Sequence, residues 1–263
     1  MRITVLGKSP AWQDAGGACS GYLVEAEGCT LLLDCGCGVF GKLREHREYW
    51  EIDAVVITHL HADHILDLVP YASALTYAPR QQPVPVGGHP GTDTPARPRL
   101  IAPAGAAKAF RQVCAGSGMR ADHVERAFEL TQYAPEDTFS LGALALSFRP
   151  VPHFVPTNAV DLREGTARLT FSADCAPNDA LCDFARDTSL LLIEATLPRP
   201  ERTGVRGHLT PEEAGEHGRR AGARRLVLSH FSDELDAEWA RREAERTFGG
   251  PVDVARAGAV YEV

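Results

Sequence analysis

Apolar and polar positions along the chain follow two different periods. Short runs rich in Leu and β-branched residues, each closed by Gly, Asp or another polar residue, predict strands, whereas apolar residues three or four positions apart predict helices. The predicted strands span residues 3–6, 21–25, 30–34, 54–58, 124–130, 144–149, 167–172, 189–194, 225–229 and 251–254. The predicted helices span residues 39–48, 65–77, 105–117, 179–186, 211–221 and 235–248. Two sheets packed against each other, with helices outside, would satisfy this pattern.

Two of the predicted helices carry proline signals. Pro70 lies inside the 65–77 helix, where it predicts a kink or an early break. The helix at 211–221 has a clear start, with Thr210 as the cap, Pro211 at the first helical position and Glu213 three residues beyond the cap. On that charged helix we expect His217 to face solvent.

Proline and glycine dominate the segment from Pro79 to Pro103, and their density excludes regular structure over most of its length. Long loops inside compact folds are usually either functional or disordered. We expect this loop to be a lid, an oligomer contact or a disordered insertion, and its composition does not choose among them. His89 within it is a candidate for substrate contact.

Composition restricts the class of protein. The length of 263 residues leaves one domain or two open, and 44% hydrophobic with 24% charged residues is ordinary for a globular chain. A formal charge of -8 without a Lys/Arg run argues against a broad nucleic-acid surface. With no apolar stretch of about eighteen residues and no signal peptide, we expect a cytoplasmic protein without a membrane span. The seven cysteines lack Cys-x-x-Cys spacing, so we expect buried packing residues.

The densest cluster of metal donors lies at residues 58–64, Thr-His-Leu-His-Ala-Asp-His, directly after an apolar strand. In an extended segment, residues two apart point the same way, so His59 and His61 can face one ion. As the chain then turns into a helix, Asp63 and His64 can turn toward a second ion. Imidazole nitrogens favour zinc and its neighbours over magnesium or calcium. The cluster therefore predicts a transition-metal site.

Four side chains cannot complete two coordination shells, so further donors must come from elsewhere in the chain. Three candidates follow predicted strands: His153 in Val-Pro-His-Phe, Asp174 in Phe-Ser-Ala-Asp and His230 in Leu-Ser-His-Phe. Each lies where a strand ends or a loop begins. The ends of neighbouring strands are the places where distant residues meet.

The His-x-His-x-Asp-His run, followed downstream by a His, an Asp and a His, resembles the metallo-β-lactamase superfamily, and the likeness extends over nearly the whole chain. The resemblance implies one α/β domain over residues 1–263, an αββα four-layer sandwich of two mixed sheets. It also matches Asp34 to an early Asp-Gly motif, where the carboxylate would support the site rather than bind metal. Ala173 departs from the Gly that often precedes the bridging Asp.

The resemblance further implies two divalent metals that share a water, which becomes the nucleophile. Zinc is expected, with Mn or Fe as alternatives, and His61 stands where diiron relatives have Glu, which favours zinc. Asp63 counts among the catalytic residues as well as the donors. The implied ligands of the first metal are His59, His61 and His153, those of the second are Asp63, His64 and His230, and Asp174 bridges both.

Two later motifs narrow the substrate. Glu194-Ala195-Thr196 and the His208-Leu209-Thr210 element are similar to the phosphodiesterase branch that includes tRNase Z and class II cyclic-nucleotide phosphodiesterases. That resemblance implies that His208 protonates the departing oxygen and that Glu194 orients the His208 ring. A leaving alkoxide requires such a proton. The long RNA-gripping arm of tRNase Z is missing from the interval of about twenty residues between His153 and Asp174. We therefore expect a small phosphodiester such as a cyclic nucleotide, and not structured RNA.

Other functions are compatible with the same donors. A lactone or thioester hydrolase would use the same metal site without a role for His208. A tRNase Z-like ribonuclease and a metal-stabilised binding protein without catalysis also remain, because fold does not determine function. A homodimer is left open.

Overall fold

The computed structural model describes residues 1–263 and contains two seven-stranded sheets. The first is built from β1 (Arg2–Gly7), β2 (Gly21–Ala26), β3 (Cys29–Leu33), β4 (Ala54–Val56), β5 (Arg99–Pro103), β6 (Glu129–Tyr133) and β14 (Val260–Glu262), in the order β14-β1-β2-β3-β4-β5-β6. The second is built from β7 (Thr138–Leu141), β8 (Leu144–Val151), β9 (Thr157–Glu164), β10 (Ala167–Phe171), β11 (Leu190–Glu194), β12 (Leu226–Ser229) and β13 (Val252–Val254), in reverse sequence order.

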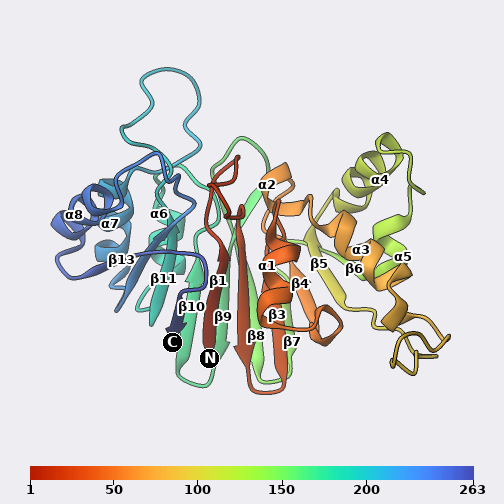
Figure 1. Ribbon diagram of the computed structural model, residues 1–263. Helices are drawn as coiled ribbons and strands as arrows, with labels where there is room; N and C mark the ends of the chain where they lie inside the picture. The colour runs from red at the N-terminus through yellow and green to blue at the C-terminus, as the bar shows by residue number, and fades with distance from the viewer.

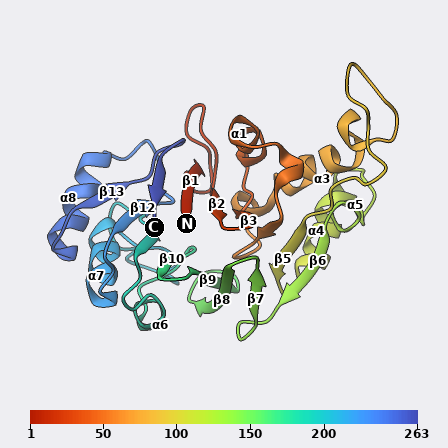
Figure 2. The same ribbon diagram turned by 90° about the horizontal axis from the view of Figure 1, so that it is seen from below.

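The sheets face each other, and helices cover both outer faces (Figures 1 and 2). The first sheet is covered by α1 (Val39–His46), α3 (Leu68–Tyr77), α4 (Ala106–Gly116) and α5 (His123–Ala127), with the short α2 (Ala62–Ile65) at one end of the strands. The second is covered by α6 (Asp179–Phe184), α7 (Pro211–Ala221) and α8 (Ala237–Phe248). Two 3₁₀ turns, η1 (Tyr49–Glu51) and η2 (Pro79–Gln81), complete the elements. The predicted αββα order is confirmed.

Three apolar layers hold this arrangement together, and strand alternation produces them. In β3, Leu31 and Leu33 face the layer between the sheets, whereas Leu32 faces the helices. In β11, Leu190 and Leu192 likewise face inward while Leu191 packs under α6 to α8. All are essentially inaccessible to solvent. A strand covered on both faces reads as a continuous apolar run, which is why these strands were recognisable in the sequence.

The strand predicted at 124–130 is wrong over most of its length. Residues His123–Ala127 form α5, and the strand β6 begins only at Glu129. Val124 and Ala127 are buried three residues apart while Arg126 is exposed, which is helical spacing over a single turn. A β-branched residue in a short apolar run could not be assigned to a helix without its neighbours.

Polar residues concealed another strand, β9, which was not predicted. Its Asp161 is 1% exposed and accepts hydrogen bonds from Arg163, Arg168 and Thr170. The pairing of this carboxylate with two guanidinium groups compensates its burial. The short strands β7 and β14 were also missed.

The proline-rich segment is more ordered at its ends than predicted. It begins with the 3₁₀ turn η2 and ends in the buried strand β5, so only residues 82–98 are irregular. Pro70 lies in the first turn of α3, which begins at Leu68, and a first turn tolerates a missing N–H. The predicted break therefore falls before the proline, between α2 and α3.

His217 does not face solvent as expected. Its side chain on α7 is buried, Nε2 accepts from the Asn178 backbone N–H at 3.0 Å, and Nδ1 donates to the Glu213 carbonyl at 2.7 Å. The start of the same helix is as predicted, because Thr210 and Glu213 form a reciprocal capping box. All seven cysteines are free, and all except Cys37 are buried. No helix has the length and apolar character that a membrane crossing requires.

Candidate metal centre

Strand direction brings the predicted donors together. β8 and β10 both run antiparallel to β9, and β10, β11 and β12 run parallel to one another, so β8, β10 and β12 end at the same edge of the second sheet. His153, Asp174 and His230 follow those three ends. In the first sheet, β4 ends beside α2, where the 59–64 cluster lies at the same end of the molecule (Figure 1).

The first donor group contains His59, His61, His153 and Asp174. His61 Nδ1 lies 3.1 Å from His59 Nε2 and 3.1 Å from His153 Nε2. Asp174 Oδ2 lies 3.8 Å from His59 Nε2 and 3.9 Å from His153 Nε2. Two ligand atoms of a tetrahedral zinc with bonds of about 2.0–2.1 Å are separated by about 3.3 Å. The spacing therefore fits one cation.

The second donor group contains Asp63, His64, Asp174 and His230. His64 Nε2 lies 3.5 Å from Asp63 Oδ2 and 3.4 Å from Asp174 Oδ2. His230 Nε2 lies 3.3 Å from each of the same two oxygens. These are again the spacings of a single coordination sphere. Oδ2 of Asp174 belongs to both groups, so one carboxylate lies between two cation positions.

Proton bookkeeping also favours a cation in each group. Nδ1–H of His153 donates to the Gly207 carbonyl at 2.7 Å, and Nδ1–H of His64 donates to Asp34 at 2.7 Å. Carbonyls and carboxylates only accept, so in the neutral form of each ring the Nε2 lone pair points toward the donor group. His64 Nε2 and Asp174 Oδ1 are buried without a hydrogen-bond partner. In that neutral form, the His64 Nε2 lone pair and the Asp174 oxygens repel one another unless a cation binds between them.

The pKa directions differ between the two donor groups. Burial lowers the pKa of His59, His61 and His153, so these imidazoles are neutral, as metal ligands must be. Burial alone would raise the pKa of Asp174, but His230 and His64 outweigh it and hold this pKa well below its ordinary value. Burial would lower the pKa of His64, but Asp174 and Asp34 raise it well above its ordinary value. These buried carboxylates therefore require a positive partner, which a divalent cation would supply in place of the His64 proton.

The carboxylate of Asp34, which directly follows β3, orients two of the proposed metal ligands. Asp34, fully buried, accepts from the Thr58 backbone N–H at 2.9 Å and from the Thr58 hydroxyl. Because that hydroxyl donates to Asp34, it accepts from His59 Nδ1 at 3.0 Å. Asp34 therefore fixes His64 directly and His59 through Thr58, the supporting role expected from the sequence. Such outer contacts set the tautomer and the ring orientation of metal-binding histidines.

The second sheet repeats this device. Glu194, also fully buried, accepts from the Thr196 hydroxyl at 2.8 Å, and that hydroxyl accepts from His230 Nδ1 at 2.8 Å. The other carboxylate oxygen accepts from His208 Nδ1 at 3.0 Å and from the Cys175 backbone N–H at 2.8 Å. Each sheet thus contributes a carboxylate–threonine–histidine relay and a second histidine on the same carboxylate. Neither threonine was predicted, although each stands one or two positions from a predicted site residue.

His208 lies beside the second donor group without belonging to it. Its ring stacks on His230 with centroids 5.5 Å apart, and Glu194, His208 and His230 bring their ligand atoms within 4.8 Å of one another. Burial would lower the pKa of His208, but the hydrogen bond and charge of Glu194 raise it to about 9. Its Nε2 carries no interaction with the protein and its side chain is 17% exposed. The ring can therefore donate a proton to a group that approaches the donors.

Three non-glycine residues at this edge have left-handed backbone. Asp34 has φ 59°, Ala173 has φ 52° and His230 has φ 49°. The strain at Ala173 gives a physical reason for the Gly usually found there, since Gly adopts this conformation freely. Gly36 is required for a different reason, because a Cβ there would lie 1.8 Å from the Asp63 carbonyl. Strained residues of this kind cluster at functional sites.

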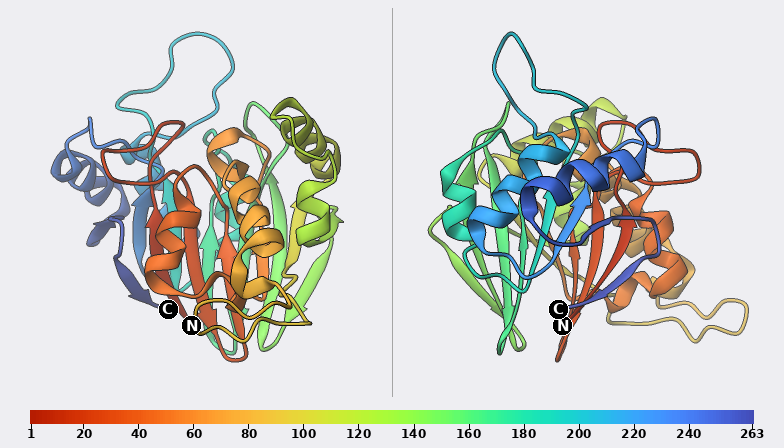
Figure 3. Two further views of the ribbon diagram at one scale, coloured as in Figure 1. Left: turned by 45° about the vertical axis from the view of Figure 1, so that its right-hand side comes forward. Right: turned by 90° about the vertical axis from the view of Figure 1, so that its left-hand side faces the viewer.

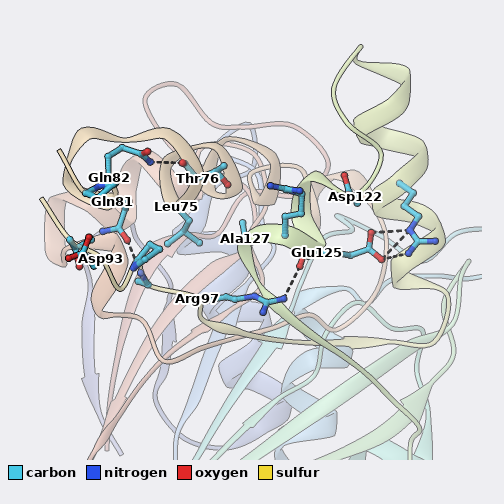
Figure 4. A pocket seen from close by; sticks show the side chains of 15 residues that line it. Leu75, Thr76, Gln81, Gln82, Asp93, Arg97, Asp122, Glu125 and Ala127 are labelled. Carbon is cyan, nitrogen blue, oxygen red and sulfur yellow. Dashed lines mark hydrogen bonds and ion pairs between the residues drawn. The ribbon is translucent and has the colours of Figure 1, made fainter.

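The 79–103 loop does not cover the donors. Residues 82–98 lie at the end of the first sheet away from α2 (Figures 1 and 3), and His89 contacts Arg80 there. A cavity of about 740 Å³ lies between this segment and α5 (Figure 4). None of the donors lines it, and an Arg111–Glu125 ion pair occupies one side. Its chemistry is unrelated to the metal centre.

A family model described as the beta-lactamase superfamily domain matches residues 30–231, which contain every predicted donor. The chain belongs to this superfamily. Membership confirms the resemblance drawn from the motif and the prediction of a metallo-hydrolase, and the superfamily implies divalent metal ions. The structure brings together the seven side chains that the motif resemblance assigned to two metals, and their role as ligands stays a prediction.

Relatives are similar over their whole length. The probable metallo-hydrolase YhfI of Bacillus subtilis is 27% identical, with both chains covered completely, and its crystal structure superposes with a TM-score of 0.84 over 99% of each chain. The uncharacterized protein Rv1339 of Mycobacterium tuberculosis is 31% identical over all of this chain and 92% of its own. The Ribonuclease Z of Myxococcus xanthus is 29% identical over all of this chain and 98% of its own.

Proposed function

We propose that this superfamily member is a binuclear metal-dependent phosphodiesterase acting on a small phosphodiester such as a cyclic nucleotide. The observation that supports this best is the Glu194–His208 pair next to the second donor group. Hydrolysis of a phosphodiester breaks a P–O bond and expels an alkoxide, which needs a proton, and a histidine held by a buried carboxylate provides one. Thioester hydrolysis gives no comparable role to His208, because a thiolate departs without needing a proton.

In this proposal the donors are His59, His61 and His153 for one position, Asp63, His64 and His230 for the other, and Asp174 for both. Two zinc ions bound there would acidify a water and offset charge on the phosphate. Asp63 is 7% exposed, and its Oδ2 lies 3.3 Å from His230 Nε2, so both atoms face the second proposed metal position.

His208 and Glu194 act together on the leaving group. Glu194 receives Nδ1–H, which leaves Nε2–H of the imidazolium free to protonate the departing oxygen. Its second oxygen holds Thr196, so the same carboxylate positions the proton donor and, through Thr196, His230. The proton donor and the second metal position therefore keep a constant separation.

Size and charge favour a small substrate over structured RNA. Between His153 and Asp174 the chain forms only the hairpin of β9 and β10, whose register is continuous from Ala167–Glu164 to Phe171–Val160. No extended arm leaves the fold in this interval. The net charge of -8 further disfavours a polyanion. Similarity to a Ribonuclease Z makes precursor tRNA the necessary comparison substrate.

The proposal is tested with zinc-loaded protein on a cyclic nucleotide, bis(p-nitrophenyl) phosphate, a lactone and precursor tRNA. His208→Ala should reduce turnover of the cyclic nucleotide by about 10²- to 10⁴-fold, because its alkoxide needs the proton. Turnover of the p-nitrophenyl ester should fall much less, since its leaving group departs as a stable anion. His46→Ala, an exposed histidine on α1, is the matched control. Turnover of the lactone alone by the wild type would refute the proposal, and equal losses on both phosphodiesters would remove His208 as the acid.

A further inference from the structure

Phe154 is an aromatic side chain that the chemistry above leaves without a role. It follows the proposed ligand His153 directly and is 51% exposed. Pro152 and Pro156 bracket the short turn that carries it, and Pro152 is anchored by its carbonyl, which accepts from the Ala176 N–H at 2.8 Å. Prolines restrict the unfolded chain and so stabilise a turn that they fit. The exposed ring is thus presented from a restrained backbone.

One side of the ring is packed against the metal centre. A Cβ on Gly207 would lie 2.3 Å from the Phe154 ring, so the ring occupies the space that any other residue at 207 would need. Its centroid lies 4.9 Å from that of His153 and 5.8 Å from that of His208. Phe154 therefore lies beside a proposed metal ligand and the proposed proton donor, whose own centroids are 4.9 Å apart, and its remaining surface is open to solvent.

We infer that Phe154 is a stacking platform for the base of a nucleoside phosphodiester, an inference that rests on the proposed phosphodiesterase function. A phosphate at the donor groups leaves its organic substituents beside the ring, because Phe154 contacts both His153 and His208. Stacking on an aromatic ring binds any base, since every base has a π face. Phe154 thus selects nucleoside esters over alkyl esters without distinguishing one base from another.

A second copy of the chain is a poorer occupant of this surface. Stable interfaces bury about 800 Å² on each partner, and one Phe side chain offers at most about 150–250 Å². A single exposed ring is sufficient for a base and insufficient for a dimer interface.

The test compares two esters with the same leaving group, thymidine 5′-(p-nitrophenyl phosphate) and methyl p-nitrophenyl phosphate, on the zinc-loaded enzyme. Phe154→Ala should raise KM for the thymidine ester by roughly five- to hundredfold, which is the usual worth of one stacked base. The kcat for both esters and the KM for the methyl ester should stay within twofold. Phe154→Leu, which keeps the contact with Gly207, should show most of the same KM rise, and Phe154→Trp should restore the wild-type value.

Tyr77→Ala is the matched control, since Tyr77 is a 62% exposed aromatic at the far end of α3 and should change neither ester. Equal effects of Phe154→Ala on the two esters would overturn the platform while leaving the phosphodiesterase intact. A fall in sedimentation coefficient accompanied by equal losses would assign the ring to a dimer and would overturn it too. Failure of the wild type on both esters would instead refute the proposed function itself.

Discussion

Replacing Asp34 with Asn should weaken metal binding while leaving the backbone almost unchanged. Asn tolerates the left-handed φ of 59° at this position nearly as well as Asp. Its oxygen can still accept from the Thr58 N–H. The amide NH₂, however, then takes the place of the oxygen that accepts from His64 Nδ1 at 2.7 Å. Either two hydrogen-bond donors, the new amide and His64 Nδ1–H, then face each other, or His64 changes tautomer and directs Nε2–H toward the proposed metal position.

The magnitude follows from this single contact. A lost hydrogen bond to a charged group costs about 1.5–3 kcal/mol. Outer-shell substitutions at metal sites reduce affinity by about 10- to 100-fold, equivalent to about 1.4–2.7 kcal/mol. The two ranges agree, so we expect Asp34→Asn to weaken the second position by 10- to 100-fold. The first position should change less, because His61 and His153 are oriented independently of Asp34.

Competition between the protein and a chromophoric zinc chelator measures both affinities. Asp161→Asn is the matched control, since Asp161 is an equally buried carboxylate. None of its partners, Arg163, Arg168 and Thr170, is a proposed metal ligand. The control should lose stability and keep both metal affinities. Two unchanged affinities in Asp34→Asn, or an equal loss in Asp161→Asn, would show that Asp34 does not orient His64 for metal binding.

Two further predictions concern stability. Gly36→Ala should destabilise the fold by about 1–3 kcal/mol in urea unfolding and reduce zinc content, because its Cβ must displace the Asp63 backbone; the control Gly41→Ala, in α1 with open space around it, should stabilise by about 0.5–1 kcal/mol. Chelation should lower Tm, and zinc at 100 times its Kd should restore about 2.7 kcal/mol for each position; identical melting curves with and without zinc would contradict the metal assignment.

The donors could be predicted from the sequence because each follows an apolar strand that is recognisable on its own. Short-range pattern also fixed the capping box at Thr210 and the burial of the cysteines. The strand β9 was missed because an interior position is filled by Asp161, and the sequence does not show that Arg163, Arg168 and Thr170 compensate the burial of its charge. His217 was misplaced because its partner, the backbone N–H of Asn178, belongs to the cap of another helix, α6.

The carboxylate–threonine–histidine relays also depend on contacts that the sequence pattern does not show. Glu194 and Thr196 were visible as a motif, yet the chain to His230 depends on β11 and β12 lying side by side. Phe154 was invisible as a candidate, because its exposure depends on how Gly207 packs beneath it. Contacts between strand ends belong to the tertiary structure, and the periodicity of apolar residues does not predict them.

The division of donors between the two sheets has a consequence for folding kinetics. Each proposed position takes donors from the first sheet and also from the second, which alone supplies His153, Asp174 and His230. Neither cation can therefore gain its full set of ligands before the sheets have docked, which makes metal capture a late step of folding. Interactions absent from a transition state slow unfolding without speeding folding. Zinc supply should thus lengthen the lifetime of the native state and leave the refolding rate of the chain unchanged.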